Sequence, residues 1–224
     1  MYVIVTLRSL LWILTTLMST LLMVSSLLSP YWLIGTKQVI TVDDVNNLTY
    51  IPSVGVYAKC GKPLREFDPR TSNCVTLAVR GLATEPSIFP TIWKVSTVFI
   101  CIGLIIMSVT VMSSLASCCF QSICRKSIFT VSGATQAVAA IFYIMGIMLY
   151  PTGWGLARVQ NLCGRDASPF YLGDCRIGIG LYTAALATAL TLVSACISFY
   201  AEKSTSSDKV QDHISEGQTL ICLP

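Results

Sequence analysis

The sequence predicts an all-α membrane protein, a four-helix transmembrane bundle carrying a small extracellular antiparallel β-sheet. The chain is 54% hydrophobic and only 12% charged, about half the charged fraction of a typical soluble domain. Its charges are clustered and leave four uncharged stretches, each longer than the roughly 20 apolar residues that cross a bilayer. The long segment between the first two stretches is rich in β-branched and aromatic residues. A soluble enzyme is excluded, because the chain has too little polar surface to cover a core.

The four stretches organise the chain as one tetraspan membrane domain over residues 1–224. We expect transmembrane helices at about 9–34, 95–117, 128–149 and 177–200, extracellular loops at about 35–94 and 150–176, and a polar cytoplasmic tail at 201–224. A cleaved signal peptide would also begin with a basic residue such as Arg8. The first stretch is longer than a usual signal core and has no Ala-x-Ala pattern before Pro30, so we expect it to be retained.

The first loop contains short segments that predict an antiparallel sheet. These segments are Val39–Val42, Leu48–Ile51, Gly55–Ala58 and Val75–Val79, separated by Asp, Asn and Pro residues. A loop of this length without structure of its own would be unusual. The sequon Asn47-Leu48-Thr49 makes Asn47 a glycosylation acceptor, and we expect it in a polar turn between two strands.

The second loop begins with Tyr150-Pro151-Thr152-Gly153-Trp154. Pro151 predicts the end of the preceding helix, because it has no amide hydrogen and its ring clashes with the previous turn. Gly153, Gly164 and Gly173 favour turns. Trp154, like the pair Tyr31-Trp32 after the first span, is the amphipathic kind of ring that a membrane interface holds.

Basic residues and cysteines predict the orientation. Arg8, Arg125-Lys126 and Lys203 lie in short segments, which favours cytoplasmic termini because the positive-inside rule weighs short segments most. Both loops are then outside the cell, where disulfides persist. From local spacing and shared compartment we predict two disulfides, Cys60–Cys74 and Cys163–Cys175.

The sequence offers no catalytic residues, no metal ligand set and no cofactor site. His213 is the only histidine, so imidazole-based acid–base or zinc chemistry has no residue to use. The spans carry no Asp, Glu, Lys, Arg or His, whereas pores and transporters usually mark their path with such groups. The net charge of +4 is spread over the loops and does not form the basic stripe of a nucleic-acid binder.

Two further features leave alternatives open. Cys118, Cys119 and Cys124 follow the second span, where thiols are either palmitoylated or reduced packing residues. Gly133, Gly146, Gly180, Ala184 and Thr188 are small residues in the third and fourth spans. They favour close helix packing inside the bundle, with a dimer face as the alternative.

Several motifs are similar to one known family. They are Pro30-Tyr31-Trp32-Leu33, Gly55-Val56-Tyr57-Ala58-Lys59-Cys60, Tyr150-Pro151-Thr152-Gly153-Trp154, Cys163-Gly164 and Leu172-Gly173-Asp174-Cys175. The chain resembles the tetraspan family of lipoma HMGIC fusion partner-like (LHFPL) proteins, whose architecture is claudin-like. Lys126–Phe129 and the tail residues Thr205–Gln211 are most similar to the branch of the family that contains its second member. Residues 62–90 depart from the family pattern.

The resemblance implies a non-enzymatic role at the plasma membrane. Relatives serve as accessory subunits or trafficking partners of larger membrane proteins, such as channels or receptors. The alternative is a claudin-like adhesion component that forms homo-oligomers at cell contacts. We expect contact with membrane lipid and none with nucleic acid. For partner binding we expect the first loop and the outer face of the first span, including the hydroxyls of Thr15, Ser19 and Thr20.

Overall fold

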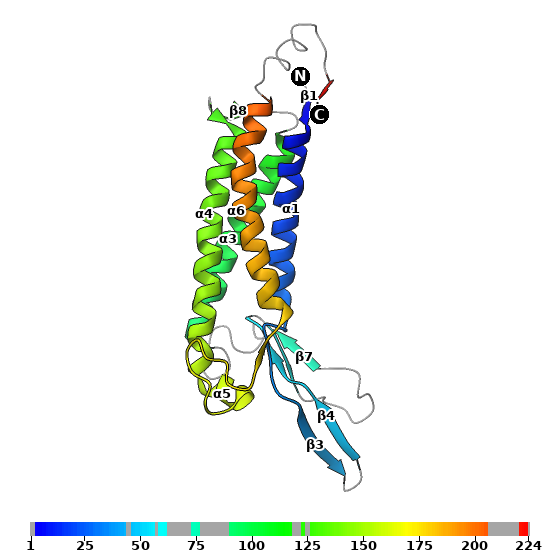
Figure 1. Ribbon diagram of the computed structural model, residues 1–224, viewed down its shortest axis with the longest axis vertical. Helices are drawn as coiled ribbons and strands as arrows, with labels where there is room; N and C mark the ends of the chain where they lie inside the picture. The colour runs from blue at the N-terminus through cyan, green and yellow to red at the C-terminus, as the bar shows by residue number, and fades with distance from the viewer. Residues whose placement is uncertain are drawn as a thin grey trace. The chain divides into compact units, whose positions relative to one another are not determined.

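The computed structural model describes residues 3–43, 46–56, 58–61, 73–76, 90–117, 122–123, 126–205 and 220–223. Within these ranges it contains four long helices, α1 (Leu7–Leu28), α3 (Thr91–Ala116), α4 (Ile128–Thr152) and α6 (Ile179–Thr205) (Figure 1). Each is long and apolar enough to cross a membrane. The helical bundle and its small antiparallel sheet confirm the predicted fold class.

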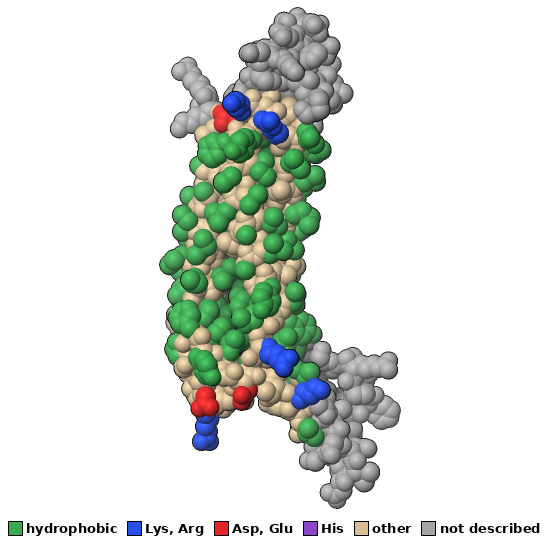
Figure 2. Space-filling view, in the orientation of Figure 1, with side chains coloured by type: hydrophobic (Ala, Val, Ile, Leu, Met, Phe, Trp, Pro, Cys, Tyr) green, Lys and Arg blue, Asp and Glu red, His purple; other side chains and the backbone are tan. Residues whose placement is uncertain are grey.

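The chain divides into two compact units, and each long helix contributes residues to both. The first unit comprises Met1–Met23, Cys101–Tyr143 and Leu186–Pro224, and the second comprises Val24–Ile100 and Ile144–Ala185. On the face drawn in Figure 2, apolar side chains cover the helical surfaces, as expected for contact with lipid.

An aromatic cluster and a polar network form the interior of the first unit. Trp12 packs edge-on against Phe129 with ring centroids 5.1 Å apart, and Ala201 is buried beside them. The Nε1–H of Trp12 donates to Oε1 of Gln136, whose amide nitrogen donates to Oγ1 of Thr16 at 2.9 Å. Thr16 also shares a 2.8 Å hydroxyl–hydroxyl bond with Ser194. These bonds join α1, α4 and α6.

Short strands also occur in the first unit. β1 (Val3–Thr6) pairs in parallel with β11 (Leu220–Leu223), so the two ends of the chain lie side by side (Figure 1). β8 (Ser122–Ile123) and β9 (Lys126–Ser127) pair antiparallel between α3 and α4. The terminal pairing was not predicted, because nothing in the polar composition of the tail indicates a strand partner.

A five-stranded sheet lies in the second unit, in the order β10-β2-β5-β6-β7. Its strands are β2 (Leu33–Ile34), β5 (Ser53–Val54), β6 (Ala58–Gly61), β7 (Asn73–Thr76) and β10 (Arg176–Ile177), all antiparallel to their neighbours. A separate hairpin pairs β3 (Gln38–Asp43) with β4 (Asn46–Tyr50). These ranges overlap the strands predicted at Val39–Val42 and Leu48–Ile51. The expected strand at Gly55–Ala58 is replaced by β5 and β6 on either side of Gly55 and Val56.

Two helix ends differ from the prediction. The first helix ends at Leu28, because Pro30 disfavours helical backbone at Ser29, and Leu33–Ile34 becomes a strand. Pro151 does not end the third span, since α4 includes it and closes at Thr152. The helix then tightens into the 3₁₀ turn η1 (Gly153–Gly155) before α5 (Ala157–Cys163).

The small residues of the third and fourth spans pack within the bundle, as expected. A Cβ on Gly133 would lie within 2.0 Å of Oγ of Ser198 in α6, and one on Gly146 within 2.6 Å of Ile100 in α3. Ala184 is fully buried and Thr188 nearly so. These positions bring backbones close together, where a larger side chain has no room.

Candidate interaction site around Tyr150 and the Cys163–Cys175 loop

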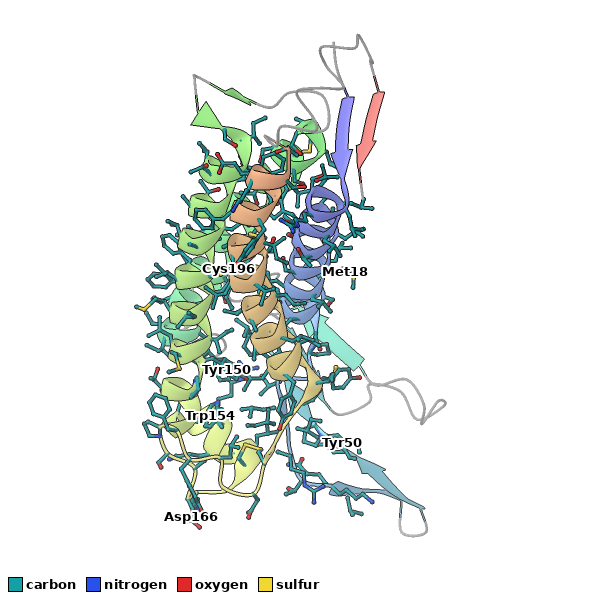
Figure 3. All side chains as sticks on the ribbon, turned by 45° about the horizontal axis from the view of Figure 1, so that its top comes forward. Met18, Tyr50, Tyr150, Trp154, Asp166 and Cys196 are labelled. Carbon is teal, nitrogen blue, oxygen red and sulfur yellow. A yellow bond between two sulfur atoms is a disulfide. The ribbon has the colours of Figure 1, made fainter. Side chains whose placement is uncertain are left out.

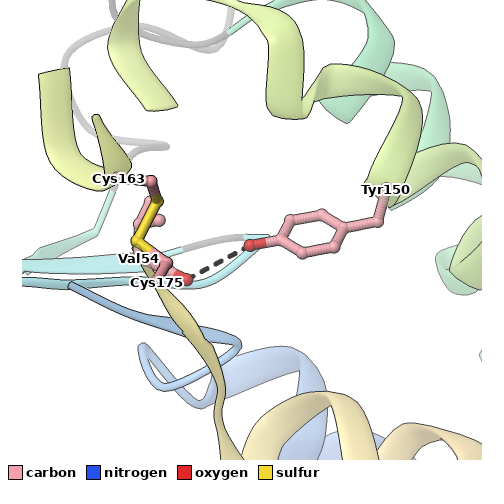
Figure 4. Close-up of a disulfide and its surroundings, with 4 residues drawn as sticks. All are labelled: Val54, Tyr150, Cys163 and Cys175. Atoms are coloured by element: carbon pink, nitrogen blue, oxygen red, sulfur yellow. Dashed lines mark hydrogen bonds between the residues drawn. A yellow bond between two sulfur atoms is a disulfide. The ribbon is translucent and has the colours of Figure 1, made fainter. Parts of the chain in front are cut away.

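Tyr150, near the end of α4, is the centre of an aromatic cluster in the second unit. Its ring is fully buried and lies edge-on to Trp32 at 4.9 Å, stacked with Trp93 at 5.2 Å and edge-on to Trp154 at 6.3 Å, measured between centroids. Its hydroxyl donates to the carbonyl oxygen of Val54 in β5 at 3.2 Å (Figure 4). The cluster therefore fixes the sheet to the end of a membrane-spanning helix.

The indoles around Tyr150 also tie separate elements together. Nε1 of Trp32 donates to the Ser26 carbonyl at 2.7 Å, and Nε1 of Trp93 donates to the Tyr150 carbonyl at 3.2 Å. Gly153 allows this approach, because a Cβ there would lie 2.4 Å from Nε1 of Trp93. Trp93 was not singled out from the sequence, although a tryptophan just after Pro90 at a helix start is a detectable signal.

Trp32 and Trp154 are enclosed by protein. Their exposed fractions are 0% and 4%, and Figure 3 shows Trp154 beside Tyr150. Of the aromatic residues for which the sequence favours a membrane interface, Tyr31 is the exposed one, at 41%. The motifs Pro30–Leu33 and Tyr150–Trp154 therefore contribute tryptophans that pack between the helix ends and the sheet.

A disulfide closes the second loop, as predicted. Cys163 at the end of α5 is bonded to Cys175, just before β10 (Figure 4). Gly173 has a φ of 58°, and a Cβ there would lie 2.5 Å from the Cys163 carbonyl, which accepts the amide hydrogen of Asp174 at 2.9 Å. Gly164 also has a positive φ, 91°. Both glycines are thus required by the turns that bring the two cysteines together.

The structure describes some of the first-loop residues that the sequence singled out. Cys60 in β6 is disulfide-bonded, and the strand register sets it opposite Cys74 in β7, so the pairing Cys60–Cys74 stays a prediction. Gly55 is buried between β5 and β6. Asn47 lies in β4, with its backbone opposite Thr41, rather than in the expected turn. Tyr57, Cys118, Cys119 and Cys124 lie outside the described residues.

Two cations of the second unit, Lys59 in β6 and Arg158 in α5, have lowered pKa values. Arg158 in α5 is half-buried, and its burial lowers the pKa of the guanidinium. Burial, and then the positive charge of Arg158, lower the pKa of Lys59 in β6. No carboxylate contributes to either shift. Lys59 is exposed, and sequence reasoning missed its electrostatic interaction with Arg158 because the two residues are far apart in the chain.

The outer face of the first span differs from the expectation. Ser19 is fully buried, and its hydroxyl donates to the Thr16 carbonyl of its own helix. Thr15 and Thr20 are half-buried and likewise donate to carbonyls of their own helix, Leu11 and Thr16. Apart from Arg8 and Ser25, the exposed side chains of α1 are apolar, among them Leu14, Met18 and Leu21; Figure 3 shows Met18 pointing away from the helices.

The part of the chain that the structure describes holds no group of three or more His, Cys, Asp or Glu residues suited to a metal ion. The features gathered here are an aromatic cluster, a disulfide-closed loop and two cations with lowered pKa values. Such an arrangement suits binding of another molecule at a surface, with aromatic packing fixing the shape.

Comparison with known proteins gives a match over most of the chain. Residues 8–203 match the family model described as "Lipoma HMGIC fusion partner-like protein". The chain is 36% identical to LHFPL tetraspan subfamily member 2a protein of Danio rerio and 36% identical to LHFPL tetraspan subfamily member 2 protein of Homo sapiens, in both cases over 99% of each chain. LHFPL tetraspan subfamily member 4 protein of Homo sapiens is 24% identical over 45% of this chain and 40% of the relative.

Proposed function

Since the chain belongs to the lipoma HMGIC fusion partner-like family of tetraspan membrane proteins, we propose that it is a non-enzymatic accessory subunit or trafficking partner of a larger integral membrane protein. A channel or receptor of the plasma membrane is the partner class. The family is not an enzyme family, and the buried polar groups of Trp12, Thr16, Gln136 and Ser194 in the first unit bond to one another. The inferred task is recognition of another protein.

The proposed orientation has both termini in the cytoplasm and the sheet outside the cell. The Cys163–Cys175 disulfide supports it, because such bonds persist in oxidising compartments. Two basic residues support it as well, Arg8 near the start of α1 and Lys203 near the end of α6.

The observation that carries the proposal is the cation pair Lys59–Arg158. Partial burial and the charge of Arg158 both disfavour the charged form of Lys59, and burial disfavours that of Arg158. An acidic side chain from a partner would neutralise both and form charge-assisted hydrogen bonds with the guanidinium. We therefore infer that the partner presents carboxylates to Lys59 and Arg158.

Crosslinking and affinity purification from native membranes test this inference. The full-length chain with Lys59→Glu and Arg158→Glu is compared with wild type and with Arg165→Glu, which reverses an exposed charge of the same unit. We expect the double variant to reach the surface but to recover at least fivefold less of the membrane partner, while Arg165→Glu recovers it normally. Equal recovery by all three would refute the acidic contact.

A second measurement separates the accessory role from adhesion. The chain is expressed alone in cells without cell-contact strands, and the contacts are viewed by freeze-fracture microscopy. We expect no strands. Strand formation by this chain alone would overturn the accessory role in favour of a claudin-like homo-oligomer.

A further inference from the structure

The turn Ser168–Tyr171 in the disulfide-closed loop has an aromatic residue where its backbone favours glycine. Ser168 and Tyr171 bond to each other through both backbone groups, at 3.1 and 2.8 Å. Pro169 is the second residue of the turn, and Phe170, the third, has a φ of 64°. A proline followed by a positive φ is the pattern of a type II turn, whose third position is usually Gly or Asn. Within the described chain, Phe170 alone among non-glycine residues has a positive φ.

The rings of Phe170 and Tyr171 do not pack inside the protein, so packing does not offset the strain of the turn. Phe170 is 62% exposed and Tyr171 is 59% exposed. Residues that break a local backbone rule tend to occur at functional positions. Two adjacent exposed rings on a strained turn therefore indicate that the rings are used outside the protein.

The turn is attached to the end of a membrane-spanning helix. The backbone N–H of Phe170 donates to the Pro151 carbonyl in the last turn of α4 at 3.2 Å. Pro169 packs against η1 so closely that a Cβ on Gly155 would lie 2.7 Å from it. The Cys163–Cys175 bond closes the same loop. The turn is thus held at the end of the candidate membrane span that contains α4.

Exposed apolar side chains of the same unit continue along α4 toward this point. Met145 is 46% exposed and Met148 is 59% exposed, as expected for side chains that face lipid. The occupant that this surface indicates is therefore the bilayer itself. Aromatic rings are enriched at the level of the lipid headgroups, where an apolar ring can be buried and a phenol hydroxyl stays hydrated.

We propose that Phe170 and Tyr171 insert into the interfacial layer of the outer leaflet beside α4 and anchor the disulfide-closed loop to the membrane. Phe170 contributes the buried ring, and Tyr171 contributes a ring with a hydrated hydroxyl. The anchor holds α5, and with it Arg158, at a fixed height above the bilayer.

Nuclear magnetic resonance of the full-length chain in phosphatidylcholine nanodiscs tests the insertion. Trifluoromethyl-phenylalanine is placed at position 170 by codon suppression, with two controls. Position 182 lies on the exposed surface of α6 within a candidate span, and position 50 lies in β4. Relaxation of each fluorine signal is measured with doxyl-labelled lipid and with a water-soluble nickel chelate.

We expect position 170 to behave like position 182, with at least twofold faster relaxation from doxyl lipid than position 50. Relaxation dominated by the nickel chelate, as at position 50, would overturn the proposal. The proposal would also be overturned if position 170 were shielded from the nickel chelate only in native membranes that contain a partner protein.

Substitution of Phe170 tests its anchoring role without breaking the turn. Phe170→Gly suits the positive φ, so the disulfide and the thermal midpoint in detergent are expected to be retained. In these variants trifluoromethyl-phenylalanine is placed at position 171 instead, and its signal should lose at least half of the doxyl-lipid effect in Phe170→Gly and more in Phe170→Asp. An unchanged lipid effect at 171 in both variants would show that Phe170 is not an anchor.

Discussion

Removing the hydroxyl of Tyr150 tests whether one hydrogen bond holds the sheet to α4. In Tyr150→Phe the ring contacts remain, but the Val54 carbonyl loses a buried donor at 3.2 Å. Loss of such a bond costs about 1–2 kcal/mol. For a chain of this size 1 kcal/mol lowers the melting temperature by about 2–4 °C, so the expected shift is about 2–8 °C. Fluorescence-detected size-exclusion chromatography of heated detergent extracts measures it.

Tyr150→Ala extends the series by removing the ring as well. Truncating a buried aromatic residue costs about 3–5 kcal/mol, and loss of the ring pairs with Trp32 and Trp93 adds about 0.5–1.5 kcal/mol each. The melting temperature should then fall by more than about 8 °C. The matched controls are Tyr182→Phe and Tyr182→Ala, at a tyrosine that is 61% exposed. If the Tyr150 variants shifted no more than these controls, the cluster would not be the structural centre inferred here.

Three further predictions concern the loops. Cys163→Ser should destabilise the chain by about 3 kcal/mol, since it opens a loop with a sequence separation of 12; non-reducing peptide mapping should show the Cys163–Cys175 bond in wild type and its loss in the variant. Asn47 should carry glycan after expression in a eukaryotic secretory pathway, and a glycosidase that caused no mobility shift would argue against an external sheet. The lowered pKa of Lys59, caused by burial and then by Arg158, means that its charge destabilises the folded state. Stability should therefore rise with pH between the folded and the unfolded pKa of Lys59. Lys59→Met should remove this rise and stabilise the chain, at pH values below the folded pKa of Lys59, by at most about 0.5 kcal/mol; an unchanged pH profile of the thermal midpoint would contradict the lowered pKa.

The sequence was sufficient for the features that depend on composition and local spacing. Long uncharged stretches predict the spans, because a bilayer demands about 20 apolar residues whatever their order. The hairpin of β3 and β4 follows from local β-branched residues and a short polar connection. The Cys163–Cys175 bond follows in the same way from two thiols close together in one loop.

Features that depend on distant contacts were not predictable. β2 and β10 have two residues each, too short for a period-two pattern, and they become strands only because the sheet brings them together. The tryptophans show the same limit. Trp32 and Trp154 have the chemistry of interfacial residues, and packing against Tyr150, which is distant in sequence from Trp32, places them in the interior instead. The strain at Phe170 is equally invisible in sequence, since Pro169 alone allows several turn types.

The fate of polar side chains in the helices bears on where partner specificity can lie. In hydrocarbon an unsatisfied hydroxyl or amide costs several kcal/mol, so such groups bond within the protein first. Thr16 and Gln136 do so in the network of the first unit, and Thr15 and Thr20 do so with their own helix. The exposed face of α1 is then mostly apolar, and apolar side chains can pack against many helices but distinguish few. Charged and polar groups outside the bilayer can discriminate, because a wrong partner leaves them unpaired. Partner choice is therefore expected to depend on the second unit, where Arg158 and the sheet lie.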